Sequence, residues 1–86
     1  MFTEERLMID EIDRKMVKLF EERMEVVSRI GLKKRELGLP ALDAEREKAV
    51  LDKVCGYLAN EAYAPYLRKF YQEIMDLAKD YQEAER

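Results

Sequence analysis

The sequence predicts an all-α protein with one long helix and two shorter ones. Glycine and proline, which interrupt helices, occur only 3 and 2 times in 86 residues. Apolar residues recur at helical spacing in three stretches, and the segments around Pro40 and Pro65 separate these stretches. Because 48% of the residues are hydrophobic, we expect a folded core within a single domain over residues 1–86.

The long helix is predicted from about Thr3 to Leu37. Thr3 is the expected N-cap, and the acidic residues that follow it suit the positive end of a helix dipole. Gly38 and Pro40 are typical of a helix end. Gly31 lies inside the helix, where it is either simply tolerated or permits the close approach of another chain or a ligand.

The length of this helix points to a second copy of the chain. About 34 helical residues span about 50 Å, whereas a small domain is about 30 Å across. Two shorter helices cannot cover such a length and also pack against each other. We therefore expect a homodimer in which the long helices of two chains pack side by side.

Two basic residues lie within the apolar face of the long helix. At about 100° per residue, Arg23 and Lys34 fall near the centre of that face, whereas Arg6 lies on its shoulder. A buried cation needs an anionic partner, so the pair suggests an anion site. The same stripe also fits a heptad seam, in which a polar residue only sets register. Its apolar members include Ile9, Ile12, Met16, Leu19, Phe20, Val27 and Ile30.

The second helix is expected to begin at Asp43, as N-cap or first-turn acid, after a loop from Pro40 to Leu42. Its charged residues Arg46 and Glu47 share the inner face with Asp43. They form either a local cap and salt bridge or part of a site. That face reads Asp43, Arg46, Glu47, Val50, Val54 and Tyr57.

The third helix follows a loop over Asn60–Ala64, and Pro65 suits its first turn. Gln82 lies on the shoulder of its apolar stripe. There its amide either donates to a ligand oxygen or is simply exposed near the C-terminus. The predicted core stripe is Leu67, Phe70, Tyr71, Ile74, Leu77, Ala78 and Tyr81.

The composition excludes several classes of function. A net charge of −3 argues against a nucleic-acid binder, which would carry a basic excess. With no histidine and one cysteine, a histidine base and a cysteine–histidine zinc site are excluded, and Cys55 is expected to be a core or boundary residue. No long apolar run or signal pattern is present, so we expect a cytoplasmic protein without a membrane span.

The inward or half-inward polar residues suit a small dianion, most naturally a dicarboxylate, because arginine forks bind carboxylates. The chain lacks an activated nucleophile, a metal cluster and a phosphate loop. A unimolecular rearrangement needs none of these, since the protein only holds a conformer and stabilises developing charge. The residues in question are Arg23, Lys34, Arg46, Glu47 and Gln82.

Several short runs in a consistent order carry a resemblance to a known family. They are Asp13–Lys15, Phe20–Arg23, Ile30–Lys34, Pro40, Asp43, Glu45–Glu47 and Ile74–Gln82. Together they resemble the all-helical (type II) chorismate mutases over essentially the whole chain. The resemblance implies an intertwined homodimer of three-helix chains. It also implies conversion of chorismate to prephenate by a Claisen rearrangement, without cofactor or metal, in phenylalanine and tyrosine biosynthesis.

The resemblance also implies roles for individual residues. Arg23 would bind one substrate carboxylate, and Arg6 would reach over from the other subunit to bind the second. Lys34 would bind a carboxylate and the ether oxygen, and Gln82 would donate to that same ether oxygen.

Further roles follow for the second and third helices. Glu47 and Asp43 would meet the ring hydroxyl, and Arg46 would support the carboxylate end. Ala78 stands where many members carry a polar residue that helps to bind a carboxylate, so this contact lacks its usual donor.

Two other functions remain as alternatives. One is a lyase on the same fold that removes pyruvate from isochorismate. Such lyases usually lack an acid at the position of Glu47, so this residue favours the mutase. The other is a non-catalytic helical interaction module, which would not need Asp43, Glu47 and Gln82 where they are.

Overall fold

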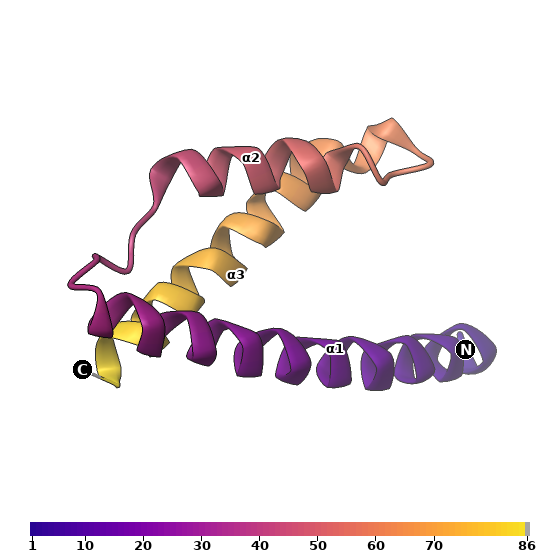
Figure 1. Ribbon diagram of the computed structural model, residues 1–86. Helices are drawn as coiled ribbons and strands as arrows, with labels where there is room; N and C mark the ends of the chain where they lie inside the picture. The colour runs from indigo at the N-terminus through magenta and orange to yellow at the C-terminus, as the bar shows by residue number, and fades with distance from the viewer. Residues whose placement is uncertain (86) are drawn as a thin grey trace.

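The computed structural model describes residues 1–85, and within them every regular element is helical. The long helix α1 spans Thr3–Glu36, α2 spans Ala44–Cys55, and α3 spans Ala64–Ala84 (Figure 1). A 3-10 turn, η1 (Glu61–Tyr63), directly precedes α3. The predicted all-α class and the division into one long and two shorter helices are confirmed. In residues 1–85, no helix is long and apolar enough to cross a membrane.

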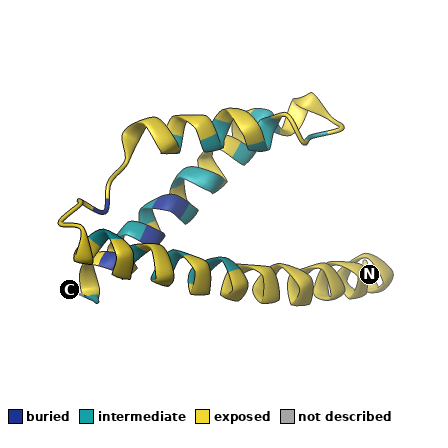
Figure 2. Ribbon diagram, viewed as in Figure 1, coloured by how far each residue is buried: buried dark blue, intermediate teal, exposed yellow. Residues whose placement is uncertain are grey.

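Helix α3 is the central element of the chain. It runs diagonally from α2 to the C-terminal end of α1 and packs against both (Figure 1). Its most deeply buried side chains are Met75, Ala78 and Gln82, each only 6–7% exposed (Figure 2). The core of the single chain therefore lies along one flank of α3.

This flank differs from the stripe that the sequence predicts. Leu77 and Tyr81 were expected in the core but are 50% and 41% exposed, whereas Gln82 was expected on the shoulder and is buried. Helical spacing locates an apolar face on α3, but α1 and α2 cover only the part of that face that includes Ala78. The remaining apolar residues of α3 stay uncovered in one chain.

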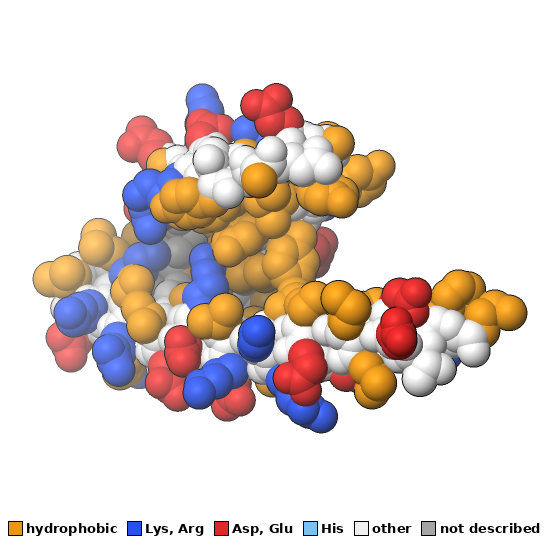
Figure 3. All heavy atoms as spheres, turned by 90° about the vertical axis from the view of Figure 1, so that its right-hand side faces the viewer, with side chains coloured by type: hydrophobic (Ala, Val, Ile, Leu, Met, Phe, Trp, Pro, Cys, Tyr) orange, Lys and Arg blue, Asp and Glu red, His pale blue; other side chains and the backbone are white. Residues whose placement is uncertain are grey.

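The N-terminal half of α1, called the α1 arm below, diverges from α2 and α3, and its residues are exposed throughout (Figures 1 and 2). Helix α1 has no fully buried residue. The predicted stripe residues Ile9, Ile12 and Leu19 are 52–62% exposed. The chain measures 53 × 24 × 15 Å, which agrees with the predicted length of about 50 Å. On the face drawn in Figure 3, hydrophobic side chains gather along the hollow between the upper and lower parts of the molecule.

The start of α1 differs by one residue from the prediction. Phe2 is the N-cap and has a left-handed backbone, with φ of 61°. Thr3 is already inside the helix, and no side chain caps this end. The prediction of Thr3 as N-cap is therefore wrong, because the chain enters the helix with a left-handed turn instead of an extended residue.

The end of α1 is a Schellman motif. The Leu39 N–H donates to the carbonyl of Lys34 at 2.8 Å, and the Gly38 N–H donates to the carbonyl of Arg35 at 3.1 Å. Gly38 has a φ of 69°, which a residue with a Cβ adopts only with strain. The predicted stop at Gly38 is thus confirmed.

Helix α2 begins as expected, because the Asp43 carboxylate accepts the backbone N–H of Arg46 at 3.0 Å. It ends earlier than expected, since Gly56 follows its last residue and the next N–H groups form turn bonds. Tyr57 is consequently outside the helix and 75% exposed, so its predicted place on the inner face is wrong. Cys55 is half-buried, as expected of a boundary residue, and Pro65 lies in the first turn of α3.

Candidate functional site

Arg23 on α1 is half-buried, and one of its nitrogens has no partner. Of the buried side-chain nitrogen and oxygen atoms in residues 1–85, Nη1 of Arg23 alone lacks a hydrogen bond. Its guanidinium carbon lies 5.9 Å from the ring centroid of Tyr71 on α3, which is a cation–π contact. An aromatic face attracts the cation but does not satisfy its N–H groups, so Arg23 retains donors for an acceptor such as a carboxylate.

Lys34 is also half-buried, on the same stripe of α1. Its Nζ donates to the carbonyl of Ala41 at 2.8 Å, and Ala41 is buried in the loop between α1 and α2. A carbonyl orients the ammonium without neutralising its charge. Two of the three ammonium protons remain free for further acceptors.

Gln82 reaches α1 between these two cations. Its Nε2 donates to the carbonyl of Val27 at 3.0 Å, and Val27 lies one helical turn after Arg23. A Cβ at Gly31 would lie only 2.9 Å from Cγ of Gln82, so the glycine makes room for this side chain. The close approach anticipated at Gly31 is real, but the approaching group is α3 of the same chain. The second N–H of the amide remains available.

Glu47 on α2 is half-buried and held by two residues of α3. Its Oε2 lies 3.0 Å from Nζ of Lys79, and its Oε1 accepts Nε2 of Gln72 at 3.2 Å. Asp76 binds the same two residues, at 3.2 Å and 3.0 Å. The hydrogen bonds to Glu47 and Asp76 raise the pKa of Lys79, and the hydrogen bonds from Gln72 and Lys79 lower the pKa of Asp76.

Sequence reasoning missed this cluster. Gln72, Asp76 and Lys79 are spaced by four and three residues, so they share one face of a helix. That spacing is a usable signal, but it does not say that Glu47 lies opposite, because the crossing of α2 over α3 is not a local property.

The other predicted residues lie outside this arrangement in the single chain. Asp43 and Arg46 are both exposed, so the inner face predicted for Asp43 is wrong in the single chain, as is that predicted for Arg46. Its position in the first turn of α2, one residue before Glu47, rotates it away from α3. The Asp43 carboxylate is already engaged in the helix cap. Arg6 is exposed in the N-terminal half of α1, 17 residues and thus about 26 Å along the helix from Arg23. Ala78 is buried, one turn before Gln82.

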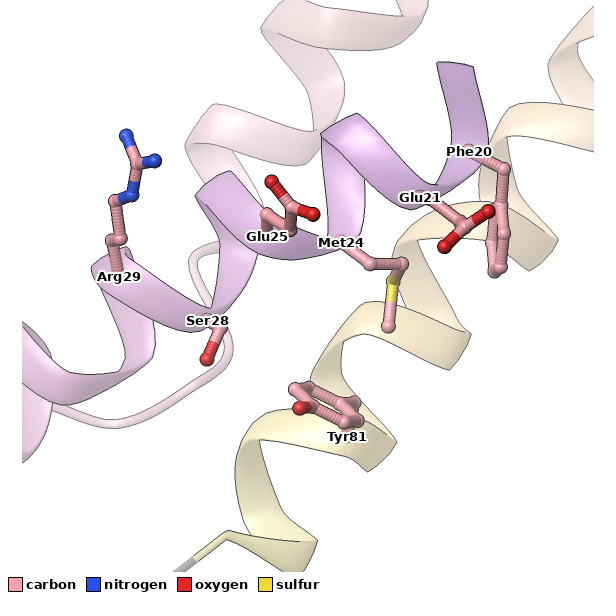
Figure 4. A pocket seen from close by; sticks show the side chains of 7 residues that line it. All are labelled: Phe20, Glu21, Met24, Glu25, Ser28, Arg29 and Tyr81. Atoms are coloured by element: carbon pink, nitrogen blue, oxygen red, sulfur yellow. The ribbon is translucent and has the colours of Figure 1, made fainter. Parts of the chain in front are cut away.

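Two of the hollows along α1 are also lined by residues of α3. One, of about 440 Å³, lies between α1 and α3 and has Arg23 in an otherwise mainly apolar lining. The other, of about 460 Å³, lies between α1 and the end of α3 (Figure 4). In Figure 4, Met24 extends toward Tyr81, whereas Arg29 points away from it. Because Glu21 and Glu25 line this second hollow, it is unsuited to a dianion.

Comparison with known proteins agrees with this geometry. Residues 5–83 match the sequence model of a family described as chorismate mutase type II. A protein named chorismate mutase from Methanocaldococcus jannaschii is 43% identical over 49 residues, which are 57% of this chain and 50% of that protein. A T-protein from Haemophilus influenzae is 46% identical over 43 residues, which are 50% of this chain and 11% of that protein.

These matches cover half or less of each relative's own length. The family match, in contrast, extends through all three helices and includes Arg23, Lys34, Glu47 and Gln82. The chain belongs to the type II chorismate mutase family.

Proposed function

We propose that this protein is a chorismate mutase that converts chorismate to prephenate and works as a homodimer without a cofactor. Family membership and the relative named chorismate mutase support this function. The observation that carries it is the buried, unpartnered Nη1 of Arg23, on the same stripe as Lys34 and with Gln82 between them. Such an arrangement binds an anion that also presents an uncharged acceptor.

The reaction is an intramolecular rearrangement, so the protein must select a conformer and stabilise charge. Arg23 binds one carboxylate of chorismate through its guanidinium fork. As the carbon–oxygen bond lengthens, negative charge grows on the ether oxygen. Lys34 and Gln82 donate to this oxygen and so bind the transition state more tightly than the substrate.

The remaining assignments concern the ring and the edge of the site. Glu47 accepts the ring hydroxyl through its remaining lone pairs. Asp43 and Arg46 act at the edge, where Asp43 fixes the start of α2 and Arg46 supports the carboxylate end. Ala78 offers no polar group, so we expect substrate binding to be weaker than with serine at this position.

The second carboxylate requires a second subunit. Arg6 is about 26 Å along α1 from Arg23, so it cannot reach the site of its own chain. The exposed apolar side chains of the α1 arm, such as Ile12 and Leu19, favour burial against an identical arm. In an intertwined dimer, Arg6 of the partner subunit would complete each site.

The function is tested by incubating the purified chain with chorismate and following its loss and the appearance of prephenate. Lys34→Ala should lower kcat by about 10²–10³-fold, because it removes a charge that acts in the transition state. Lys33→Ala, which removes the neighbouring exposed charge, should keep nearly full activity. Circular dichroism would verify that both variants remain helical.

Two results would contradict the proposal. Unchanged chorismate consumption by Lys34→Ala would exclude the assigned role. Release of pyruvate from isochorismate, with no turnover of chorismate, would identify the chain as a lyase instead.

A further inference from the structure

We propose that Lys79 and Gln72 of α3 are positioning residues that orient the Glu47 carboxylate toward the ring hydroxyl of chorismate. This inference rests on the proposed function, since it concerns the same site. It adds two residues that the sequence pattern did not bring into the site.

The geometry of the contacts carries the inference. Each oxygen of Glu47 has its own partner, with Lys79 Nζ 3.0 Å from Oε2 and Gln72 Nε2 3.2 Å from Oε1. Both partners come from α3, whereas Glu47 lies on α2. A carboxylate held at both oxygens cannot rotate freely. Since it has about four acceptor positions, it still has room for a substrate hydroxyl.

Asp76 holds the two partners in turn. It accepts Nε2 of Gln72 at 3.0 Å and lies 3.2 Å from Nζ of Lys79. Contacts therefore join four side chains in a closed ring, in the order Glu47, Lys79, Asp76 and Gln72. The pKa of Lys79 is raised by these carboxylates, so its ammonium stays charged over the neutral range.

The charge of Lys79 serves a second purpose. A carboxylate near a doubly negative substrate repels it, and this repulsion weakens binding unless a cation lies beside the carboxylate. The Lys79 side chain is 27% exposed and the Glu47 side chain 17%, so solvent screens the pair only in part. Lys79 therefore weakens the repulsion between Glu47 and the carboxylates of chorismate, although it shares its charge with Asp76.

The chain offers a matched control for a purely structural role. Arg68 and Asp52 also join α3 to α2, at 3.1 Å, but on side chains that are 47% and 60% exposed. Arg68→Met removes this tether and leaves Glu47 and its partners in place. An effect that comes only from joining the two helices should appear in Arg68→Met as well.

The test measures kcat/KM for chorismate and for the analogue in which hydrogen replaces the ring hydroxyl. Lys79→Met should lower kcat/KM for chorismate by about 10- to 100-fold, the range expected when a substrate contact is misplaced. The same variant should lower the value for the analogue by a clearly smaller factor, because the analogue meets the uncompensated charge of Glu47 but has no hydroxyl contact to lose. Glu47→Gln should show the same selective loss of kcat/KM for chorismate. Lys79→Arg, which keeps the charge, should retain most of the wild-type value. Arg68→Met should leave kcat/KM unchanged for both substrates.

Each alternative result has a definite meaning. The positioning role would be overturned if Lys79→Met lowered kcat/KM equally for both substrates, or for neither. The proposed function would still stand in that case, provided that the wild-type protein converts chorismate. If the wild-type protein does not convert chorismate, both are overturned. Should Lys79→Met fail to fold by circular dichroism, Gln72→Met removes the other partner of Glu47, and the same pattern decides the question.

Discussion

At the scale of single residues, Gly31 and Gln82 constrain each other closely. Gln82 is 7% exposed and bound to the carbonyl of Val27, so it cannot move aside without losing a buried hydrogen bond. A methyl group at Gly31 would come within 2.9 Å of its Cγ. Overpacking of this kind typically costs about 1–3 kcal/mol.

We predict that Gly31→Ala has opposite effects in two backgrounds. In the wild-type chain, the clash offsets the gain of about 1 kcal/mol in helix propensity, so the substitution destabilises or is neutral. In the Gln82→Ala background, the clash is gone and the same substitution should stabilise the helix. Urea unfolding of the four proteins measures this cycle. An identical effect of Gly31→Ala in both backgrounds would show that Gln82 does not limit position 31.

The residue scale also shows where sequence reasoning succeeds. The places of Arg23 and Lys34 on one stripe of α1 follow from helical period alone, because both lie on the same regular element. The contacts of Gln72 and Lys79 with Glu47 could not be predicted in this way. They depend on the angle at which α3 crosses α2, and that angle is set by the packing of many side chains at once.

At the scale of elements, the joint between α2 and α3 is partly electrostatic. The pKa of Asp76 is lowered, first by the hydrogen bond from Gln72 and then by Lys79. A carboxyl with a lowered pKa adds stability that is complete above its ordinary value of 3.8 and is lost as the pH falls through the lower, folded value. For Lys79 the sign is opposite, since its raised pKa adds stability that is lost only as the pH rises above 10.5.

We therefore predict a pH-dependent effect of Asp76→Asn. The variant should melt at a lower temperature than the wild type at pH 7, and this difference should vanish as the pH falls well below 3.8. Asp80→Asn, which changes an exposed carboxyl of the same helix, serves as the control for loss of charge. A difference for Asp76→Asn that persists unchanged in strong acid would contradict the electrostatic cause.

The boundaries of the elements were predicted where a local signal is strong. Gly38 ends α1 and Asp43 caps α2, because a left-handed turn and a side-chain cap each depend on one residue. Tyr57 was misplaced because helical spacing continued past Gly56, whereas the helix did not. Leu77 and Tyr81 were misplaced because an apolar stripe does not reveal which surface will cover it.

At the scale of the whole molecule, the arm of α1 has little contact with the rest of its own chain. Its apolar side chains between Ile9 and Leu19 are exposed, and they line a surface that one chain leaves open. Arms from two chains can bury these side chains against each other.

We predict that Ile12→Lys disrupts the proposed homodimer. Ile12 is 52% exposed in one chain, so a lysine would be harmless there, but a charge buried between two arms is costly. The variant should run as a monomer in light scattering and lose most mutase activity, because Arg6 of the partner subunit is then absent. Glu22→Lys, at an exposed position of the same helix, should remain dimeric and active. A monomeric wild type with full activity would contradict the paired-arm arrangement.

The uncovered arm has a consequence for how the protein responds to dilution. If the largest share of apolar burial is intermolecular, the folded state is governed by mass action, and its population depends on how many chains are present. Lowering the concentration would then not simply separate intact subunits. It would shift the equilibrium toward unfolded chains, so that association and folding are one event.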